Sequence, residues 1–288
     1  MPRSAYSGRL DKLKYVETFQ ILACEIQVQT DSAAFSDRLR YVVQHASQNH
    51  EITDRAVYEI AQNGDDVVLR EDGVIAATEQ NSEILFEALF KKIHQRAFAA
   101  LPDDVRIHAA SGIHNGRMFL LVGNPHSGKS TLAIHLLGAG MEMVGDELVM
   151  LRDGLAAAFP RKFYLREASV DLLPALKEAA PSLPRVYDSA GMRRMAVDPT
   201  VFGRPWHIAR LPVGAIFYLD PDFGSRTKSK RSSKIDMVRL VMEQSSPPRS
   251  GRNNWIGDLC AMVNGASTHV LAVGELDSAL AVIHHTLD

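Results

Sequence analysis

The sequence predicts an α/β fold, with a small α+β lobe at the N-terminus and a larger α/β domain after it. Short apolar runs alternate with helical stretches after residue 105, which is typical of a parallel sheet wrapped by helices. The run 117–122 (RMFLLV) is almost wholly apolar, as expected for a central parallel strand buried on both faces. Before residue 105 the chain mixes strand patterns with two helical patterns. These observations predict a lobe over residues 1–104 and a domain over residues 105–288.

In the N-terminal lobe, mixed apolar and polar residues predict the strands, and helical spacing of apolar residues predicts the helices. The expected strands cover residues 15–29, 57–60 and 67–77. Gly64 and Gly73 mark turns beside the later strands. The expected helices cover residues 32–47 and 82–101, and Pro102 ends the second of them.

In the larger domain, apolar runs of strand length predict the sheet, and the stretches between them predict the covering helices. The expected strands cover residues 117–122, 141–144, 215–219 and 269–273. The expected helices cover residues 129–137, 235–242, 256–263 and 278–285.

The bulk composition excludes several classes of function. Of the 288 residues, 46% are apolar and 23% charged, which is enough for a large core. The formal net charge of -2 gives no general attraction to nucleic acid or anionic lipid. Cys24 and Cys260 show no spacing typical of zinc or disulfide sites, and no stretch has the length and apolarity of a membrane span. We therefore expect a cytoplasmic protein with no nucleic-acid or membrane partner.

Residues 123–130 (GNPHSGKS) satisfy G-x-x-x-x-G-K-[ST], the P-loop or Walker A pattern, directly between an apolar strand and a predicted helix. Glycines allow a tight turn whose N–H groups point at the β-phosphate of a nucleotide. Lys129 is expected to reach the β- and γ-phosphate oxygens, and the Ser130 hydroxyl to bind Mg²⁺. The predicted nucleotide-binding residues are Gly123, Asn124, Pro125, His126, Ser127, Gly128, Lys129, Ser130 and Thr131.

Two adjacent carboxylates, Asp146 and Glu147, follow the next predicted strand. Carboxylates at the carboxyl end of a parallel strand face the crevice where open α/β sheets bind ligands. One can hold Mg²⁺, and the other can accept the proton of an attacking hydroxyl. An exposed acidic turn is the alternative interpretation, because acidic residues are common at strand ends. The sequence contains neither the NKxD motif of GTPases nor the LSGGQ motif of transporter ATPases.

Residues 107–131 and 140–149 resemble the catalytic core of HPr kinase/phosphorylase, a family similar in turn to the P-loop of phosphoenolpyruvate carboxykinase. In that family a histidine precedes the P-loop strand, and a paired-acid motif ends the next strand. His108, the loop 123–130 and the pair Asp146-Glu147 fall in that order here. The resemblance implies a P-loop kinase core of this type after the N-terminal lobe.

The resemblance also implies ATP and Mg²⁺ as cofactors and a serine hydroxyl of a protein or peptide as the phosphoryl acceptor. It implies that Asp146 acts as the base and that His108 lies near the acceptor. Glu147 stands where the family usually has a second Asp. The implied metal ligands are Ser130, Asp146 and Glu147. A histidine that is simply hydrogen-bonded at a strand edge is the alternative for His108. The family tends to assemble, which suggests a homo-oligomer.

One feature of the family, its Glu-x-Arg-Gly loop, has no recognisable match in this sequence. The nearest basic segment is 161–166 (RKFYLR), in which Arg166 or Lys162 is the candidate to bind the transferring phosphoryl group. A solvated strand flank is the alternative. Kinases similar to this family also phosphorylate the terminal serine of ribosomally made precursors such as lasso peptides, and the divergent N-terminal lobe suggests that class of acceptor.

Two further functions stay open: a small-molecule kinase on the same core, and a non-catalytic nucleotide-binding regulatory module. The segment 226–234 (RTKSKRSSK) carries five cations and no aromatic residue that could stack on a base, so it does not indicate a nucleic-acid site. A solvated or disordered loop is the expected structure of this segment. The alternative is a mobile flap that contacts an acidic or phosphorylated substrate near the active site.

Overall fold

The computed structural model describes residues 13–42, 47–48, 50–187 and 192–288. Its contacts divide the chain into two compact units. The first unit consists of Met1–His45 and His50–Leu101, and the second of Ala46–Asn49 and Pro102–Asp288. The short strand β3 (Ser47–Gln48) belongs with the second unit because it pairs with β16 (His207–Ile208), which a single predicted boundary does not anticipate.

The first unit is a five-stranded sheet with two helices, α1 (Ala33–Val42) and α2 (Ser82–Ala99). The strand order is β1-β2-β4-β5-β6, in which only β2 and β4 run parallel. The bounds are β1 Tyr15–Ile21, β2 Cys24–Thr30, β4 Asp54–Asn63, β5 Asp66–Glu71 and β6 Val74–Glu79. The predicted strand 15–29 is therefore a hairpin. The helix predicted over 32–47 ends at Val42, and residues 43–46 lie outside the described residues.

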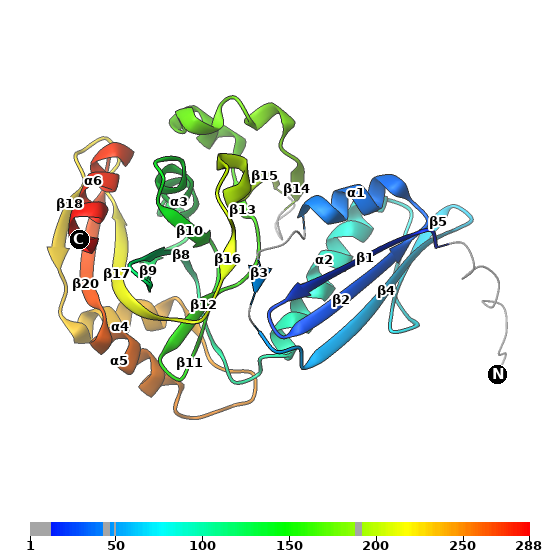
Figure 1. Cartoon of the computed structure of the whole chain (residues 1–288), viewed down its shortest axis with the longest axis horizontal. Helices are drawn as coiled ribbons and strands as arrows, with labels where there is room; N and C mark the ends of the chain where they lie inside the picture. The colour runs from blue at the N-terminus through cyan, green and yellow to red at the C-terminus, as the bar shows by residue number, and fades with distance from the viewer. Residues whose placement is uncertain (1–12, 43–46, 49, 188–191) are drawn as a thin grey trace. The chain divides into compact units, whose positions relative to one another are not determined.

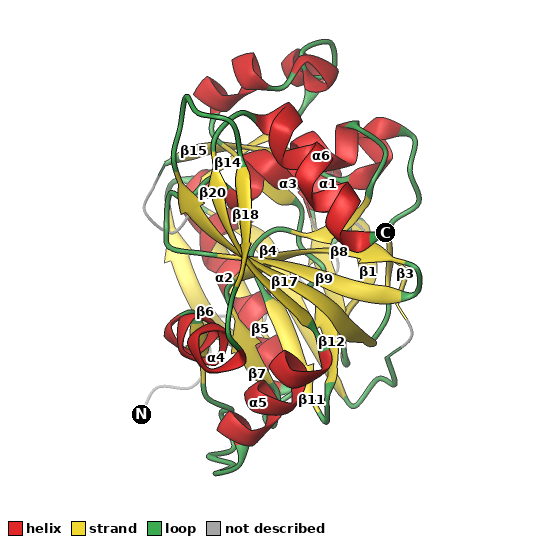
Figure 2. Cartoon of the chain, turned by 90° about the vertical axis from the view of Figure 1, so that its left-hand side faces the viewer, coloured by secondary structure: helices red, strands yellow, loops and turns green. Residues whose placement is uncertain are grey.

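The second unit is built on a ten-stranded sheet in which β10-β8-β9-β17-β12-β11-β7-β19 are neighbours, with β20 beside β17 and β18 beside β20 (Figure 2). The first strands are β7 Val105–Ile107, β8 Ala109–His114, β9 Arg117–Val122, β10 Glu142–Gly145, β11 Val149–Arg152 and β12 Leu155–Ala158. The later strands are β17 Leu211–Pro221, β18 Lys228–Arg231, β19 Ser245–Ser246 and β20 Ser267–Val273.

The expected parallel sheet is present only in part, because among the described strands of this sheet only β17 runs parallel to its neighbours, β9 and β20. Hairpins add antiparallel strands: Asn115-Gly116 joins β8 to β9, and Asp153-Gly154 joins β11 to β12, with all four residues at positive φ. Such turns match the twist of antiparallel strands. The antiparallel strands β8, β11 and β12 are also mostly buried, so their apolar runs resemble those of parallel strands.

Helices cover both faces of the parallel strands (Figure 1). On one face, buried residues of α4 (Lys234–Glu243) and α5 (Trp255–Gly265) pack in one core with alternate residues of β9 and β17. On the other face lie α3 (Lys129–Gly138), which contacts β8 and β10, and α6 (Leu276–Leu287), which contacts β20. This layering places the N-terminus of α3 at the carboxyl end of β9.

A smaller sheet of order β13-β15-β14 follows β12 in the chain and contacts α3 through β13. Its strands are β13 Phe163–Leu165, β14 Arg185–Tyr187 and β15 Arg193–Val197. Short 3-10 turns surround it at Glu167–Leu172, Pro174–Leu176, Ala180–Ser182 and Pro199–Phe202. The small sheet brings the basic segment 161–166 towards the carboxyl end of β10.

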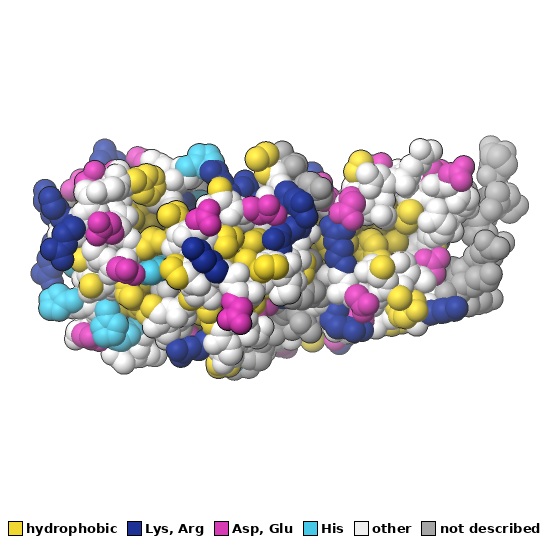
Figure 3. Space-filling view, turned by 90° about the horizontal axis from the view of Figure 1, so that it is seen from above, with side chains coloured by type: hydrophobic (Ala, Val, Ile, Leu, Met, Phe, Trp, Pro, Cys, Tyr) yellow, Lys and Arg dark blue, Asp and Glu magenta, His cyan; other side chains and the backbone are white. Residues whose placement is uncertain are grey.

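The basic segment 226–234 is not a free loop. Four of its residues form the edge strand β18, which pairs antiparallel with β20, and Lys234 begins α4. All four β18 side chains are exposed, and blue Lys and Arg side chains follow the left-hand edge of Figure 3, where Figure 1 places β18. Cations on an edge strand oppose pairing with other chains.

Candidate functional site

The glycine-rich loop 123–130 connects β9 to α3, and each of its two glycines is required for a different structural reason. A Cβ on Gly123 would lie 2.8 Å from the Ser127 Oγ and 3.0 Å from the Leu219 carbonyl oxygen, so the backbone is too crowded for a side chain. Gly128 lies in the left-handed region at φ 89°, which favours glycine, and Leu132 N–H donates to its carbonyl as α3 begins. The loop therefore places backbone N–H groups at a helix N-terminus, where anions bind.

Strand order places the predicted site residues along one edge of the sheet. Val122 pairs with Ala109, and the Ala109 N–H donates to the Glu147 carbonyl, so the ends of β9 and β10 are level with the start of β8. Strand β10 follows β9 and α3 in the chain but is not the neighbour of β9 in the sheet, because β8 lies between them and runs the opposite way. His108 precedes β8 and therefore lies at the edge between the glycine-rich loop and Asp146.

Lys129 is buried at the first position of α3. Its Nζ donates to the carbonyl oxygens of Gly123 at 2.7 Å and Asn124 at 2.9 Å. Within the described part of the chain, it forms no ion pair with a carboxylate. Burial lowers the pKa of Lys129 to about 8, although Asp146 and Glu147 favour its charged form. The ammonium group is thus held inside the loop, close to acids with which it is not paired.

Asp146 is buried, and only one of its two carboxylate oxygens has a hydrogen-bond partner among the described residues. Oδ2 accepts a hydrogen bond from the Tyr164 N–H at 3.1 Å, whereas Oδ1 has no partner. Burial, followed by the charge of Glu147, raises the pKa of Asp146 to about 7. Arg161, the Ser130 hydroxyl and the Tyr164 N–H act in the opposite direction. Ser130 and Asp146, both predicted metal ligands, therefore lie close together.

Glu147 differs from Asp146 because its charge is paired. The Arg161 guanidinium forms an ion pair with Glu147 and lies 3.9 Å from the ring centre of Tyr164. The Glu147 side chain is 41% exposed, so it faces solvent more than Asp146 does. The charge of Glu147 is therefore neutralised by Arg161, whereas the charge of Asp146 is poorly compensated.

His108 is partly buried beside the same groups. Burial lowers the pKa of its imidazole, and the nearby Lys129 charge lowers it further. Glu147 opposes both effects through its charge and through a hydrogen bond to its backbone. That His108 lies near an acceptor stays a prediction. The hydrogen bond between its imidazole and the Glu147 backbone also fits a purely structural role.

The two basic candidates of segment 161–166 lie in different surroundings. Arg166 is exposed and its guanidinium contacts the His126 imidazole of the glycine-rich loop. Lys162 is buried, and its Nζ lies 2.5 Å from the Asp198 carboxylate. Because that ion pair occupies its ammonium group, Lys162 is removed as a candidate to bind phosphate. His126 is exposed and has a positive φ of 69°.

Three residues at the site were not found from the sequence: Arg161, Gln244 and Phe223. Arg161 pairs with Glu147 as described, and the Gln244 amide donates to the Asn124 side chain at 3.0 Å. Phe223 follows β17 and lies against Gly128. A sequence signal for Phe223 was available, because this aromatic residue closely follows an apolar strand that Asp220-Pro221 ends. No local pattern marks Gln244, which reaches the loop only through the tertiary fold.

The donor set fits a metal ion that also binds phosphate oxygens. No group of three or more His, Cys, Asp or Glu residues in the described part of the chain could enclose a metal ion. The partnerless Oδ1 of Asp146 and the nearby Ser130 hydroxyl are instead oxygen ligands of the kind that Mg²⁺ prefers. Mg²⁺ usually takes one or two protein ligands together with substrate phosphates and water.

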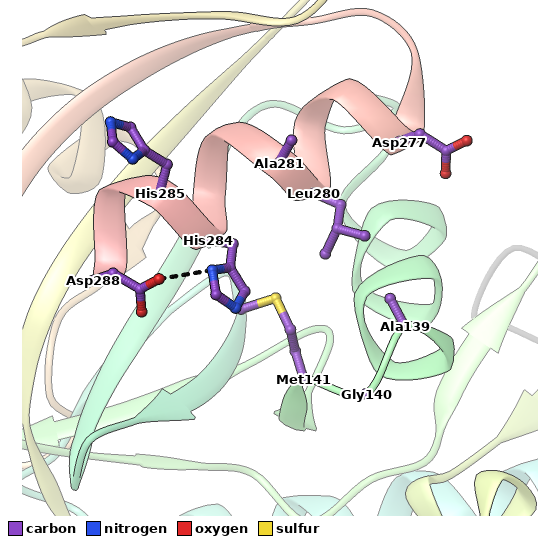
Figure 4. A pocket seen from close by; sticks show the side chains of 9 residues that line it. All are labelled: Ala139, Gly140, Met141, Asp277, Leu280, Ala281, His284, His285 and Asp288. Carbon is purple, nitrogen blue, oxygen red and sulfur yellow. Dashed lines mark ion pairs between the residues drawn. The ribbon is translucent and has the colours of Figure 1, made fainter.

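A cavity of about 480 Å³ lies at the other end of α3 and is separate from the glycine-rich loop (Figure 4). Ala139 to Met141 border it on one side, and residues of α6 on the other. The labelled His284 side chain pairs with Asp288 at 2.9 Å. Because α3 has ten residues, about 15 Å of helix separates this cavity from Lys129.

Comparison with known proteins gives matches among solved structures but none in sequence. No protein-family model matches the chain, and no curated protein matches it in sequence. Among solved structures, it is similar to the Hpr(Ser) kinase/phosphatase from Coxiella burnetii, at 12% sequence identity and a TM-score of 0.30. The match covers 63% of this chain and 96% of that chain. A similarity of this extent carries no argument about activity or substrate. None of the described helices combines the length and apolarity needed to cross a membrane.

Proposed function

We propose that this chain is an ATP-dependent kinase that transfers the γ-phosphoryl group to a serine hydroxyl of a protein or peptide. The observation that carries the proposal is that Lys129, at the start of α3, and Asp146, after β10, are both buried and near one another, while neither forms an ion pair among the described residues. Buried charges without an ion-pair partner are costly, so a fold that keeps two of them close together favours a ligand that satisfies both.

Each group has a role that follows from its surroundings. The loop N–H groups and the Lys129 ammonium would hold the phosphates of ATP, and Ser130 with a carboxylate would hold Mg²⁺. The bound ion neutralises charge that develops on the phosphate oxygens. Asp146 has a pKa of about 7, so near neutral pH its carboxylate can accept the proton of an acceptor hydroxyl. The ion pair with Arg161 holds Glu147 in place beside it.

Arg166 would stabilise the phosphoryl group during transfer, because its exposed guanidinium already contacts the loop at His126. Arginine binds phosphate oxygens with two parallel hydrogen bonds. His108 lies at the edge between the loop and Asp146, where an acceptor hydroxyl would approach.

The experiment is phosphoryl transfer from γ-labelled ATP to a serine-peptide library. Asp146→Asn should reduce the transfer rate by about 10²- to 10⁴-fold, because a carboxamide cannot accept the proton. Lys129→Ala should abolish nucleotide binding and transfer. Asp65→Asn, in an exposed turn of the first unit, is the matched control and should transfer at the wild-type rate. Unchanged transfer by Asp146→Asn would refute the role of Asp146, and tight ATP binding without transfer to any acceptor would refute the kinase.

A further inference from the structure

Phe223 is an exposed aromatic ring on the turn that follows β17. Its exposure is 67%, which is large for a phenyl ring. A Cβ on Gly128 would lie 3.8 Å from Cε1 and 4.0 Å from Cζ of Phe223, so the ring lies beside the glycine-rich loop with space between them for about one methyl group. Most of the surface of Phe223 is open to solvent.

The turn that carries Phe223 is held firmly by hydrogen bonds. The Asp222 N–H donates to the Val273 carbonyl at 2.8 Å, and the Glu275 N–H donates to the Ser225 carbonyl at 2.8 Å. The Ser225 hydroxyl donates to the Asp222 carboxylate at 2.7 Å. These bonds tie the turn to the end of β20. The ring is therefore presented to solvent by a preorganised turn, and ordering it on binding costs little conformational entropy.

Strand order separates Phe223 from the acidic side of the site. Along the edge, β10 with Asp146 and β8 with His108 lie on one side of the glycine-rich loop, and β17 with Phe223 lies on the other. In the proposed kinase the terminal phosphate faces Asp146, since Asp146 and Ser130 lie together. The opposite end of the nucleotide, its base, then extends towards β17.

We propose that Phe223 is the base-binding residue of the site and that the nucleobase stacks on its exposed face. The inference rests on the proposed function, because it requires a nucleotide in the glycine-rich loop. Stacking on a phenyl ring is available to every base, since each base has a flat π-face. The ring therefore adds affinity for a nucleoside triphosphate without selecting adenine over guanine by hydrogen bonds.

The test compares MgATP with magnesium and inorganic triphosphate, which has the phosphates but no base, by calorimetry. Phe223→Ala should raise the Kd for MgATP about tenfold and leave the Kd for inorganic triphosphate within about twofold. MgGTP should lose affinity by a similar factor. Phe223→Tyr should keep the wild-type Kd for MgATP. Ile235→Ala, a more exposed apolar side chain on α4, is the control and should change neither Kd.

The outcomes separate the two proposals. If Phe223→Ala leaves MgATP binding unchanged, or weakens MgATP and inorganic triphosphate equally, the ring does not stack on the base, while the proposed kinase stands. If the folded wild-type protein binds neither ligand, both proposals are overturned. A loss confined to the ligands that carry a base supports the assignment of Phe223.

Discussion

Two lysines of the second unit, Lys129 and Lys162, are almost equally buried but have opposite surroundings. They are 6% and 2% exposed, and burial lowers the pKa of both. Lys162 forms a direct ion pair with Asp198, which also caps the turn Pro199–Phe202 through the Thr200 N–H. Among the described residues, Lys129 donates to two backbone carbonyls and pairs with no carboxylate, and the nearby Asp146 has one oxygen without a partner.

The difference indicates which buried charges hold the fold together and which are kept for a ligand. Removing one partner of a buried ion pair strongly destabilises the protein, because the other charge stays buried without compensation. A buried charge without a partner instead destabilises the protein until a ligand binds it. Lys162 therefore stabilises the fold, and Lys129 is the charge that we propose for a ligand. Matched substitutions of the two lysines, and of Asp146, test this division.

The largest expected loss of stability is in Lys162→Met, which keeps the volume but removes the charge. It leaves Asp198 buried and unpaired, so the free energy of unfolding should fall by about 3–5 kcal/mol. Chemical denaturation of the wild type and the variant measures it. Arg55→Met, which removes a pair between exposed Arg55 and Glu25, is the control and should change stability by less than about 1 kcal/mol. Equal losses in both variants would contradict a structural role for Lys162.

The next effect is a loss of stability as pH rises, caused by the titration of Asp146. The pKa of Asp146 is about 7 in the folded protein and near 3.8 when unfolded, so the folded state binds more protons between these values. The free energy of unfolding should therefore fall as pH rises from 4 to 7, by up to about 4 kcal/mol from this group. Asp146→Asn should remove that fall, and denaturation between pH 4 and 8 tests it. Parallel pH profiles of the two proteins would rule out an unpaired Asp146.

The same titration predicts the pH dependence of transfer. Only the ionised form of Asp146 can accept a proton, so the transfer rate of the wild type should rise with pH while this carboxylate ionises and level off above that range. The measurement is the initial rate at saturating MgATP between pH 5.5 and 8.5. A rate that is flat over this range would show that the ionisation of Asp146 does not limit transfer.

The smallest effect is expected in Lys129→Met, the counterpart of Lys162→Met. The pKa of Lys129 is about 8 when folded and near 10.5 when unfolded, so wild-type stability should rise between these values by up to about 3 kcal/mol. The variant should lack this rise. At pH 7 the free energy of unfolding of the variant should be no more than about 1 kcal/mol below that of the wild type, while nucleotide binding is lost. Destabilisation as large as that of Lys162→Met would end the distinction between the two lysines.

The sequence predicted the local elements of the fold better than the way they combine. The expected strand 117–122 is β9, and the helix expected over 129–137 is α3, because both have strong local patterns. The direction of neighbouring strands was not recoverable from apolar runs, since β8, β11 and β12 are buried like parallel strands. The turns Asn115-Gly116 and Asp153-Gly154 were the available signals of antiparallel pairing.

The candidate site follows the same division. Lys129, Ser130 and Asp146 could be proposed from the sequence because a spacing pattern marks the loop and a carboxylate pair follows a strand. Arg161 lies in the basic segment that the sequence shows, but its pairing with Glu147 is set by the tertiary fold. Gln244 reaches the loop from a segment that is distant in sequence and carries no pattern of its own. For Lys162 the sequence shows a basic residue near the site, but it does not show that Asp198 neutralises this residue in the folded protein.

The strand between the loop and the carboxylates sets a spacing that side chains cannot alter. Neighbouring strands lie about 4.8 Å apart, so β9 and β10, with β8 between them, are separated by nearly 10 Å at their carboxyl ends. Main-chain hydrogen bonds maintain that separation, whichever residues β8 carries. In the proposed kinase, the backbone would therefore set the width available to a terminal phosphate, a metal ion and an acceptor. Substitutions on the surface would then change which acceptor binds without changing that width.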